Sequence, residues 1–323
     1  MSAMPASIHH RGLGVWAWGL LLLLACLPPL LSALGMEFYL GVLSRVLIFA
    51  IAASSLNLIL GFGGMVSFGH AAFVGLGAYT VGILAEAGVV QAWVAWPLAM
   101  LVSALAAALI GVISLRTRGV YFIMITLAFA QMFYYLMVSL KAYGGEDGLP
   151  LSQRSLAPGL DLQNDAQFFW LILALGALVM AALQRWVNSP FGQILQGIKE
   201  NEQRMSAVGS PVFAVQWQAF VLAGALAGLA GALLANLNGL VTPHMLHWSQ
   251  SGQLLIMLII GGAGALWGGA LGAAVLLLLE ELLSGYTLHW QMVLGVLLLC
   301  VVLFAHKGLA GLVVARKRGA KHE

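Results

Sequence analysis

The sequence predicts an all-α polytopic membrane protein with about ten transmembrane helices, some of them broken at glycine-rich points. Hydrophobic residues make up 62% of the 323 residues, whereas charged residues make up only 8%. A soluble domain of this size could not bury that much apolar surface or cover the rest with so few charges. The apolar residues also fall into runs of about 20, the length that crosses a bilayer as a helix. Clusters of glycine interrupt these runs near residues 61–77 and 261–272.

The apolar runs divide one transmembrane domain, residues 1–323, into successive candidate spans. The first, Gly14–Leu34, follows Arg11, and its apolar run is too long for a typical signal sequence, so we expect a retained anchor. The other candidate spans are Phe38–Leu60, Ser67–Ala85, Ala92–Ser114, Val120–Leu140, Phe168–Val187, Val212–Ala235, Ser251–Ala265, Gly268–Ser284 and Trp290–Ala305.

The basic residues predict the orientation of these spans. If the N-terminus is cytoplasmic, the basic tail at residues 306–323 is cytoplasmic as well, and only Lys141 and Arg154 fall in external loops. The basic residues that then lie on the cytoplasmic side are Arg11, Arg116, Arg118, Arg185, Lys199, Arg204 and Lys307. This bias follows the positive-inside rule and places both termini in the cytoplasm. The net charge of +3 is too small to argue for a nucleic-acid partner.

The segment Ser189–Gly209 is the longest polar, helix-compatible stretch between the spans. Ser189 can cap a helix and Pro190 fits its first turn. Apolar residues recur at helical spacing after them, so we expect one short amphipathic helix in the cytoplasm. Its free face either binds a protein partner or lies on lipid headgroups. Glu200 and Glu202 suit an anionic membrane surface poorly and favour the protein partner.

The largest external loop, Lys141–Gln167, contains the turn-forming run Gly144-Gly145-Glu146-Asp147-Gly148. The loop is either a flexible connector or part of a docking surface for an external protein. The sequence leaves these two interpretations open.

The two glycine clusters can also be interpreted in two ways. Small residues permit close packing of helices, which explains each glycine taken singly. Discontinuous helices that line a path explain the clusters, because the glycines interrupt apolar runs. The candidates for the path are Gly64, Gly69, Gly261, Gly262 and Gly264.

His70 and Arg45 are the ionisable residues expected inside the membrane. His70 is a candidate for contact with a substrate or a gate, although a neutral histidine bonded to a backbone carbonyl would be equally stable. Arg45 is expected to extend toward the interface or to pair with an acid such as Glu37, and it is not assigned to the path.

Other classes of protein lack support in the sequence. It contains no metal-ligand cluster, no phosphate-binding loop and no context for a catalytic triad, which argues against an enzyme. An ion-gradient-driven secondary transporter or channel would need paired acids or a chain of ionisable groups near the midplane.

Five blocks of the sequence, taken together and in order, resemble the M-type permease subunit of branched-chain amino-acid ABC transport systems. The blocks are Leu56–Tyr79, Arg118–Met132, Gly144–Leu149, Ser189–Glu202 and Ile259–Leu283. The resemblance implies the ABC importer permease fold in a bacterial inner (plasma) membrane. It also implies a five-part importer: two different permeases, two cytoplasmic ATP-binding subunits and an external substrate-binding protein.

The resemblance further implies that the partner ATPases bind ATP and Mg²⁺, so that this chain needs no cofactor of its own. Leucine, isoleucine and valine are the expected substrates, with urea, short amides or small carboxylates as the alternative. The residues expected to couple to the ATPase are Gly192, Glu200, Asn201, Glu202 and Gly209. The residues expected to dock the binding protein are Gly144, Gly145, Glu146, Asp147 and Gly148.

Overall fold

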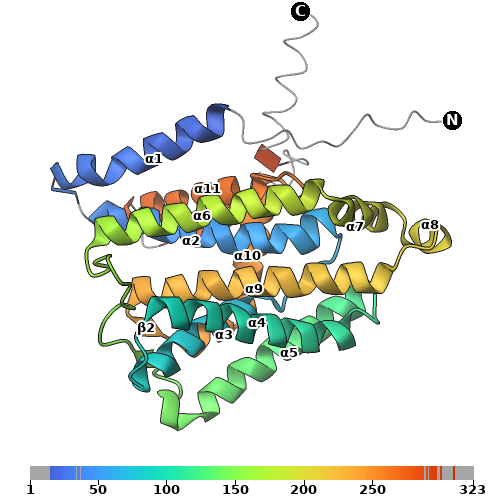
Figure 1. The fold of residues 1–323 in the computed structure, drawn as a ribbon, viewed down its shortest axis with the longest axis horizontal. Coiled ribbons are helices and arrows are strands. Elements are labelled where there is room, and N and C mark those ends of the chain that lie inside the picture. The colour runs from blue at the N-terminus through green and yellow to red at the C-terminus, as the bar shows by residue number, and fades with distance from the viewer. Residues whose placement is uncertain are drawn as a thin grey trace, which may run out of the picture.

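The computed structural model describes residues 15–33, 35–36 and 38–286, with further positions at 289, 291–296, 299 and 308–309. Its helices run side by side along one axis and form a bundle (Figure 1). The expected span Trp290–Ala305 and the basic tail 306–323 lie largely outside the described residues. Arg11 and Glu37 lie outside them as well.

The described part of the chain is almost entirely helical. The apolar helices are α1 (Val15–Ala33), α2 (Phe38–Asn57), α3 (His70–Glu86), α4 (Ala92–Ser114), α5 (Val120–Ser139), α6 (Asp165–Asn188), α9 (Val212–Asn238), α10 (Trp248–Gly261) and α11 (Gly268–Tyr286). The shorter helical elements are the π-helical turn η1 (Leu58–Phe62), the 3₁₀ turns η2 (Lys141–Tyr143) and η3 (Pro243–Leu246), and the polar helices α7 (Pro190–Glu200) and α8 (Glu202–Ala207). Strands β1 (Leu149–Pro150) and β2 (Leu240–Val241) pair antiparallel, with Leu149 opposite Val241.

Within the described residues, six helices are long and apolar enough to cross a membrane: α2 together with η1, α4, α5, α6, α9 and α11. The expectation of about ten spans is therefore confirmed only in part. Helix α3 is apolar but has only 17 residues, and α10 has 14. A helix of 14 residues is about 21 Å long, shorter than the hydrocarbon core of about 30 Å. The expected span Ser251–Ala265 is therefore wrong as a complete crossing.

Helix α10 begins inside the bundle because the chain turns back after α9. Val241 of β2 lies beside Gly82, near the end of α3, and Leu246 of η3 lies against Gly75, about two turns deeper. The Ser251 hydroxyl, in the first turn of α10, then accepts a hydrogen bond from the backbone N–H of Ala71 at 2.8 Å. Helix α10 therefore starts beside the first turn of α3, at mid-depth in the bundle.

Small residues set the packing at the centre of the bundle, where α9 contacts both α3 and α4. Gly231 and Gly228 of α9 lie against the backbone of α3 at Val74 and Gly77. Gly228 also lies against Ser103 of α4. No side chain fits between these backbones, so the glycines allow the close helix approach that is usual in membrane bundles.

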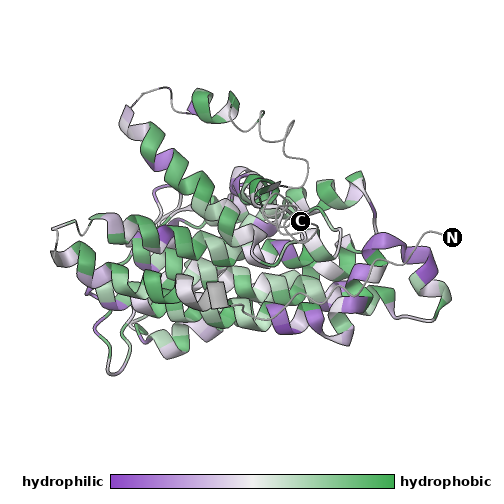
Figure 2. Cartoon of the chain, turned by 90° about the horizontal axis from the view of Figure 1, so that it is seen from above, coloured by the Kyte–Doolittle hydropathy of each residue, from purple (hydrophilic) through white to green (hydrophobic). Residues whose placement is uncertain are grey.

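Polar residues gather at the two ends of the bundle. Figure 2 shows hydrophobic residues along the length of the helices and hydrophilic residues concentrated around α7 and α8. Strand β2 lies at the opposite end (Figure 1). We refer to these two ends as the α7 end and the β2 end.

The glycine contacts predict that Gly231→Ala lowers stability. An added Cβ at this position would overlap the carbonyl oxygen of Val74. Overpacking of this kind costs about 1–3 kcal/mol. We expect a lower midpoint of thermal unfolding in detergent, with size-exclusion chromatography as the measurement of unfolding.

The matched control is Gly176→Ala in α6, where an added Cβ would meet Ile51 at an ordinary 3.9 Å. Equal unfolding midpoints for the two variants would contradict the packing argument.

Candidate functional site

The two glycine-rich breaks meet at the α7 end of the bundle. Asn57, the last residue of α2, donates from Nδ2 to the carbonyl oxygen of Ala265 at 2.7 Å. Its Oδ1 accepts a hydrogen bond from the backbone N–H of Gly264 at 3.0 Å. An added Cβ at Gly61 would lie only 2.5 Å from the Gly264 nitrogen. One buried amide side chain therefore joins two segments that are about 200 residues apart in the sequence.

Lys199 of α7 joins the same contact. Its Nζ donates to the carbonyl oxygen of Gly61 at 2.6 Å. That carbonyl is available because η1 ends at Phe62, and the last carbonyls of a helix have no partner within the helix. A cation also suits the negative end of the helix dipole. We call the set Asn57, Gly61, Lys199, Gly264 and Ala265 the glycine junction.

The other glycines that were candidates for the path also make close contacts. An added Cβ at Gly64 would lie 3.0 Å from Cγ of Lys199, and one at Gly69 would lie 2.8 Å from the carbonyl oxygen of Thr126. Gly261 lies against the backbone of Gly268. Gly262 has a φ of +105°, which favours glycine. These contacts favour the packing interpretation, and a role in lining a path stays a prediction.

His70 is fully buried and hydrogen-bonded. Its Nε2 lies 2.8 Å from Oγ of Ser55, whose hydroxyl donates to the carbonyl oxygen of Ala52 at 2.7 Å. Since that hydroxyl proton is already used, the Nε2–H of His70 is the donor to Ser55. The ring also packs edge-on against Phe73. These contacts favour the structural interpretation of His70.

The segment Ser189–Gly209 forms two helices, so the expectation of a single helix is wrong. Ser189 caps α7 as predicted and accepts from the backbone N–H of Gly192 at 3.5 Å. Asn201 then adopts an extended conformation and caps α8 by accepting from the backbone N–H of Arg204 at 2.9 Å. Short polar side chains compete in this way with the helical backbone. Gly209, with a φ of +85°, ends the segment.

The apolar stripe of this segment faces the bundle and is not free. Leu195 and Ile198 are buried, and Gly192 packs against the carbonyl oxygens of Trp186 and Val187 at the end of α6. Gly192 therefore serves contact within this chain. The exposed residues of α7, of α8 and of the position between them are mainly polar, and they include Glu200 and Asn201.

The two acids of the segment differ in their contacts. Glu202 forms an ion pair with Arg118 at 2.8 Å, which ties α8 to the turn before α5. The Arg118 side chain is 73% exposed, so this pair contributes little to stability. Glu200 is exposed and has no ion-pair partner among the described residues.

The glycine run of the loop 141–167 forms a compact turn at the β2 end. Gly144, Gly145 and Gly148 have positive φ, and the backbone N–H of Gly148 donates to the Gly144 carbonyl oxygen at 3.2 Å. Gly148 also lies against the backbone of Val241 in β2. The glycines are thus part of the packing, while Glu146 and Asp147 are exposed between them.

The remainder of this loop is anchored as well. Arg154 pairs with Asp165 at 2.6 Å, donates to the Leu162 carbonyl oxygen at 3.0 Å, and lies over the Phe168 ring. These contacts argue against a flexible connector.

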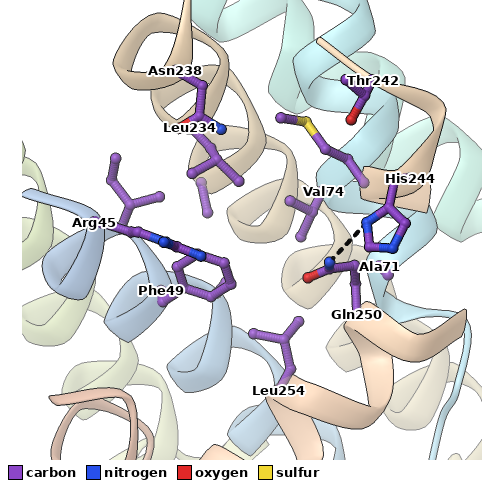
Figure 3. A pocket seen from close by; sticks show the side chains of 14 residues that line it. Arg45, Phe49, Ala71, Val74, Leu234, Asn238, Thr242, His244, Gln250 and Leu254 are labelled. Atoms are coloured by element: carbon purple, nitrogen blue, oxygen red, sulfur yellow. Dashed lines mark hydrogen bonds between the residues drawn. The ribbon is translucent and has the colours of Figure 1, made fainter. Parts of the chain in front are cut away.

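A cavity of about 260 Å³ lies between α2, α3, α9, η3 and α10 (Figure 3). Its polar residues are Arg45, Asn238, Thr242, His244 and Gln250. The Arg45 guanidinium lies over the Phe49 ring, 5.8 Å from its centroid, and points into the cavity. Sequence reasoning missed this site. Arg45 is one turn before Phe49 in an apolar run, but the partners from η3 and α10 become neighbours only through the return of the chain into the bundle.

Comparison with known proteins places the chain among permeases. Residues 38–302 match the family model described as branched-chain amino acid transport system / permease component. The chain is 26% identical over 290 residues to the high-affinity branched-chain amino acid transport system permease protein LivM of Salmonella typhimurium, covering 82% of this chain and 68% of that protein. It is 26% identical over 313 residues to LivM of Escherichia coli K12, covering 90% and 73%.

A shorter similarity connects the chain with a second permease. It is 26% identical over 144 residues to the permease protein LivH of Escherichia coli K12, covering 44% of this chain and 46% of that protein. No solved structure matches the chain.

The glycine junction predicts that Asn57→Ala loosens the second break. The substitution leaves the Gly264 N–H and the Ala265 carbonyl without the partner that Asn57 supplies. Each such loss costs about 1–3 kcal/mol, which is about 5- to 150-fold in a local opening equilibrium. Hydrogen–deuterium exchange of residues 262–266 should therefore become faster by at least about five-fold.

Gln203→Ala on the exposed face of α8 is the control and should leave this exchange unchanged. Unchanged exchange in Asn57→Ala would show that the second break does not depend on Asn57.

Proposed function

The chain belongs to the family of branched-chain amino acid transport system permease components, and from this premise we propose that it is a membrane-spanning subunit of an ATP-driven, binding-protein-dependent importer. As a permease component it is multi-pass and not a catalytic subunit. The proposed substrates are leucine, isoleucine and valine, in agreement with the names of the related LivM proteins. Urea, short amides and small carboxylates are the alternative substrates.

The proposed assembly contains a second permease, two ATP-binding subunits and an external binding protein. The similarity to LivH supports a permease pair whose members share an ancestor. The sequence has no phosphate-binding loop of the G-x-x-x-x-G-K-[ST] type, so ATP and Mg²⁺ would be bound by the partner ATPases.

We place the α7 end in the cytoplasm of a bacterial cell and the β2 end outside. The basic residues supply the reason, because Arg118, Arg185, Lys199 and Arg204 lie on or beside α7 and α8. Basic residues favour the cytoplasmic side. In this orientation α7 and α8 face the ATPases, and the loop 141–167 faces the binding protein.

The observation that carries the proposal is the hydrogen bond from Lys199 to Gly61. A helix that merely covers the membrane surface would need no bond to a broken span. Lys199, the residue before the exposed Glu200 in α7, donates a hydrogen bond to Gly61, where the two glycine breaks meet. Movement of α7 by an ATPase would therefore displace the end of η1 directly and the segment after α10 through Asn57.

Reversal of the charge on Glu200 should uncouple ATP hydrolysis from transport. The whole assembly in liposomes, with ATP inside and leucine-loaded binding protein outside, should take up radiolabelled leucine. Glu200→Lys places a like charge against basic groups of the ATPase. Such contacts cost several kcal/mol, so uptake should fall at least about ten-fold, together with substrate-stimulated hydrolysis.

Two controls separate this role from folding. Glu86→Lys, an exposed acid at the β2 end, should leave uptake unchanged. The exchange of Glu202→Arg with Arg118→Glu keeps the ion pair but reverses the surface charge on α8. Normal uptake by Glu200→Lys would exclude an ATPase contact at Glu200. Normal uptake by the exchange variant would show that Glu202 contributes only through its ion pair with Arg118.

The exposed acids at the β2 end should contribute to docking of the binding protein. Glu146→Lys with Asp147→Lys should lower the affinity of the liposome-bound permease for the binding protein and reduce the salt dependence of that affinity. Glu86→Lys at the same end is the matched control. An affinity and salt dependence equal to those of the unmodified chain would exclude these two acids from the docking surface.

A further inference from the structure

We propose that the cavity between α2, α3, α9, η3 and α10 is a subsite for the zwitterion of an α-amino acid with an aliphatic side chain. This proposal rests on the proposed function, because it names the part of this chain that contacts the transported substrate. It assigns the carboxylate, the ammonium group and the side chain of the ligand to three different parts of the cavity wall.

The size and lining of the cavity select a small amphipathic ligand. Its volume of about 260 Å³ is below the range of about 300–1,000 Å³ that is usual for drug-sized ligands. Arg45, Asn238 and His244 are exposed at its rim, whereas Ile48 and Phe49 are buried at its base. The cavity therefore fits a ligand that has one polar end and one apolar end.

Arg45 is the group that would bind the carboxylate. It lies about 10 Å along α2 from the start of that helix, where a cation is costly unless it has a function. It has no acidic partner among the described residues, and its guanidinium is held against Phe49. A guanidinium is permanently charged and presents a planar set of donors that binds a carboxylate through two hydrogen bonds.

Gln250 is the group that would accept from the ammonium. Its amide nitrogen lies 3.2 Å from Nδ1 of His244 and can only donate, so His244 accepts through that atom. This bond holds the amide so that its oxygen lies on the cavity side, across from Arg45 (Figure 3). A carbonyl oxygen is a suitable acceptor for an ammonium, and the Thr242 hydroxyl lies in the same wall.

The apolar wall between these groups accounts for the side chain. It includes Ile48, Phe49, Val74, Leu234 and Leu254. Burial of methyl and methylene groups against such a wall is favourable and roughly proportional to the area buried. Urea has no apolar part that would use this wall, so the cavity favours an aliphatic amino acid over the alternative substrates.

The elements that line the cavity also connect it to the α7 end. Arg45 is on α2, which ends at Asn57, and Gln250 is on α10, which ends just before Gly264. These are the two ends that the glycine junction joins to Lys199. A displacement of α7 would therefore move the carboxylate-binding and ammonium-binding groups relative to each other and release the ligand.

Direct binding to the permease pair tests the subsite without the binding protein. The pair, purified in nanodiscs, is titrated with radiolabelled L-leucine in a scintillation proximity assay. Leucinamide lacks the carboxylate and 4-methylpentanoate lacks the ammonium, so both should displace leucine poorly. Arg45→Gln should weaken leucine binding about ten-fold or more, the size of a charge-assisted hydrogen bond, and Arg45→Lys should weaken it less.

Two further variants make the test specific. Gln250→Leu should bind leucine and 4-methylpentanoate with similar affinity, because the acceptor for the ammonium is removed. Arg116→Gln, the same chemical change at an exposed position outside the cavity, should bind leucine as the unmodified pair does. If Arg45→Gln fails to fold, the competition series and the Gln250→Leu variant still test the subsite.

The outcomes separate the subsite from the proposed function. The subsite is overturned if the unmodified pair shows no saturable leucine binding, if leucinamide competes as well as leucine, or if Arg45→Gln binds leucine normally. ATP-dependent leucine uptake by the whole assembly would then leave the proposed function intact. Failure of that uptake, with leucine-loaded binding protein present, would instead contradict the proposed substrate.

Discussion

The side chain of Asn57 is the interaction on which the arrangement of the broken helices depends. The continuous helix α2–η1 and the short helix α10 both end at this junction, and each leaves backbone groups without partners. In an apolar bundle such groups are costly unless they are paired. Asn57 pairs two of those beyond α10, and Lys199 pairs one at the end of η1. The polar helix α7 thereby helps to satisfy the backbone where these two apolar helices end.

Close approach of backbones is the second constraint, and it explains why glycine is needed where these helices end. A side chain at Gly61 would separate the first break from the second, and Asn57 could no longer span the two. The same holds at the centre, where Gly228 and Gly231 bring α9 onto α3. Packing and the proposed coupling are therefore compatible for these glycines, because a closely packed junction is what the proposed movement of α7 would act on.

Much of the fold could be predicted from the sequence, because apolar run length and helix signals are local. Helix α4 has the predicted bounds Ala92–Ser114, and the Ser189 cap of α7 was also predicted. The shortness of α10 and the break at Asn201 were not predicted, since each depends on contacts with other parts of the fold. The cavity at Arg45 was missed for the same reason: its walls come from five elements, and the return of the chain through η3 leaves no periodic signal.

In the proposed assembly, the break at Asn201 would determine how a movement of the ATPase reaches the bundle. A single continuous helix would carry its apolar stripe and its acids on one rigid rod, so a partner could only tilt the whole segment. The extended residue at Asn201 separates a helix whose Leu195 and Ile198 are buried in the bundle from one whose residues are not buried. In the proposed mechanism, α8 would follow the partner while α7 keeps its contacts with the bundle. A displacement would reach the glycine junction only when it moves α7 itself, since Lys199 lies two residues before the break.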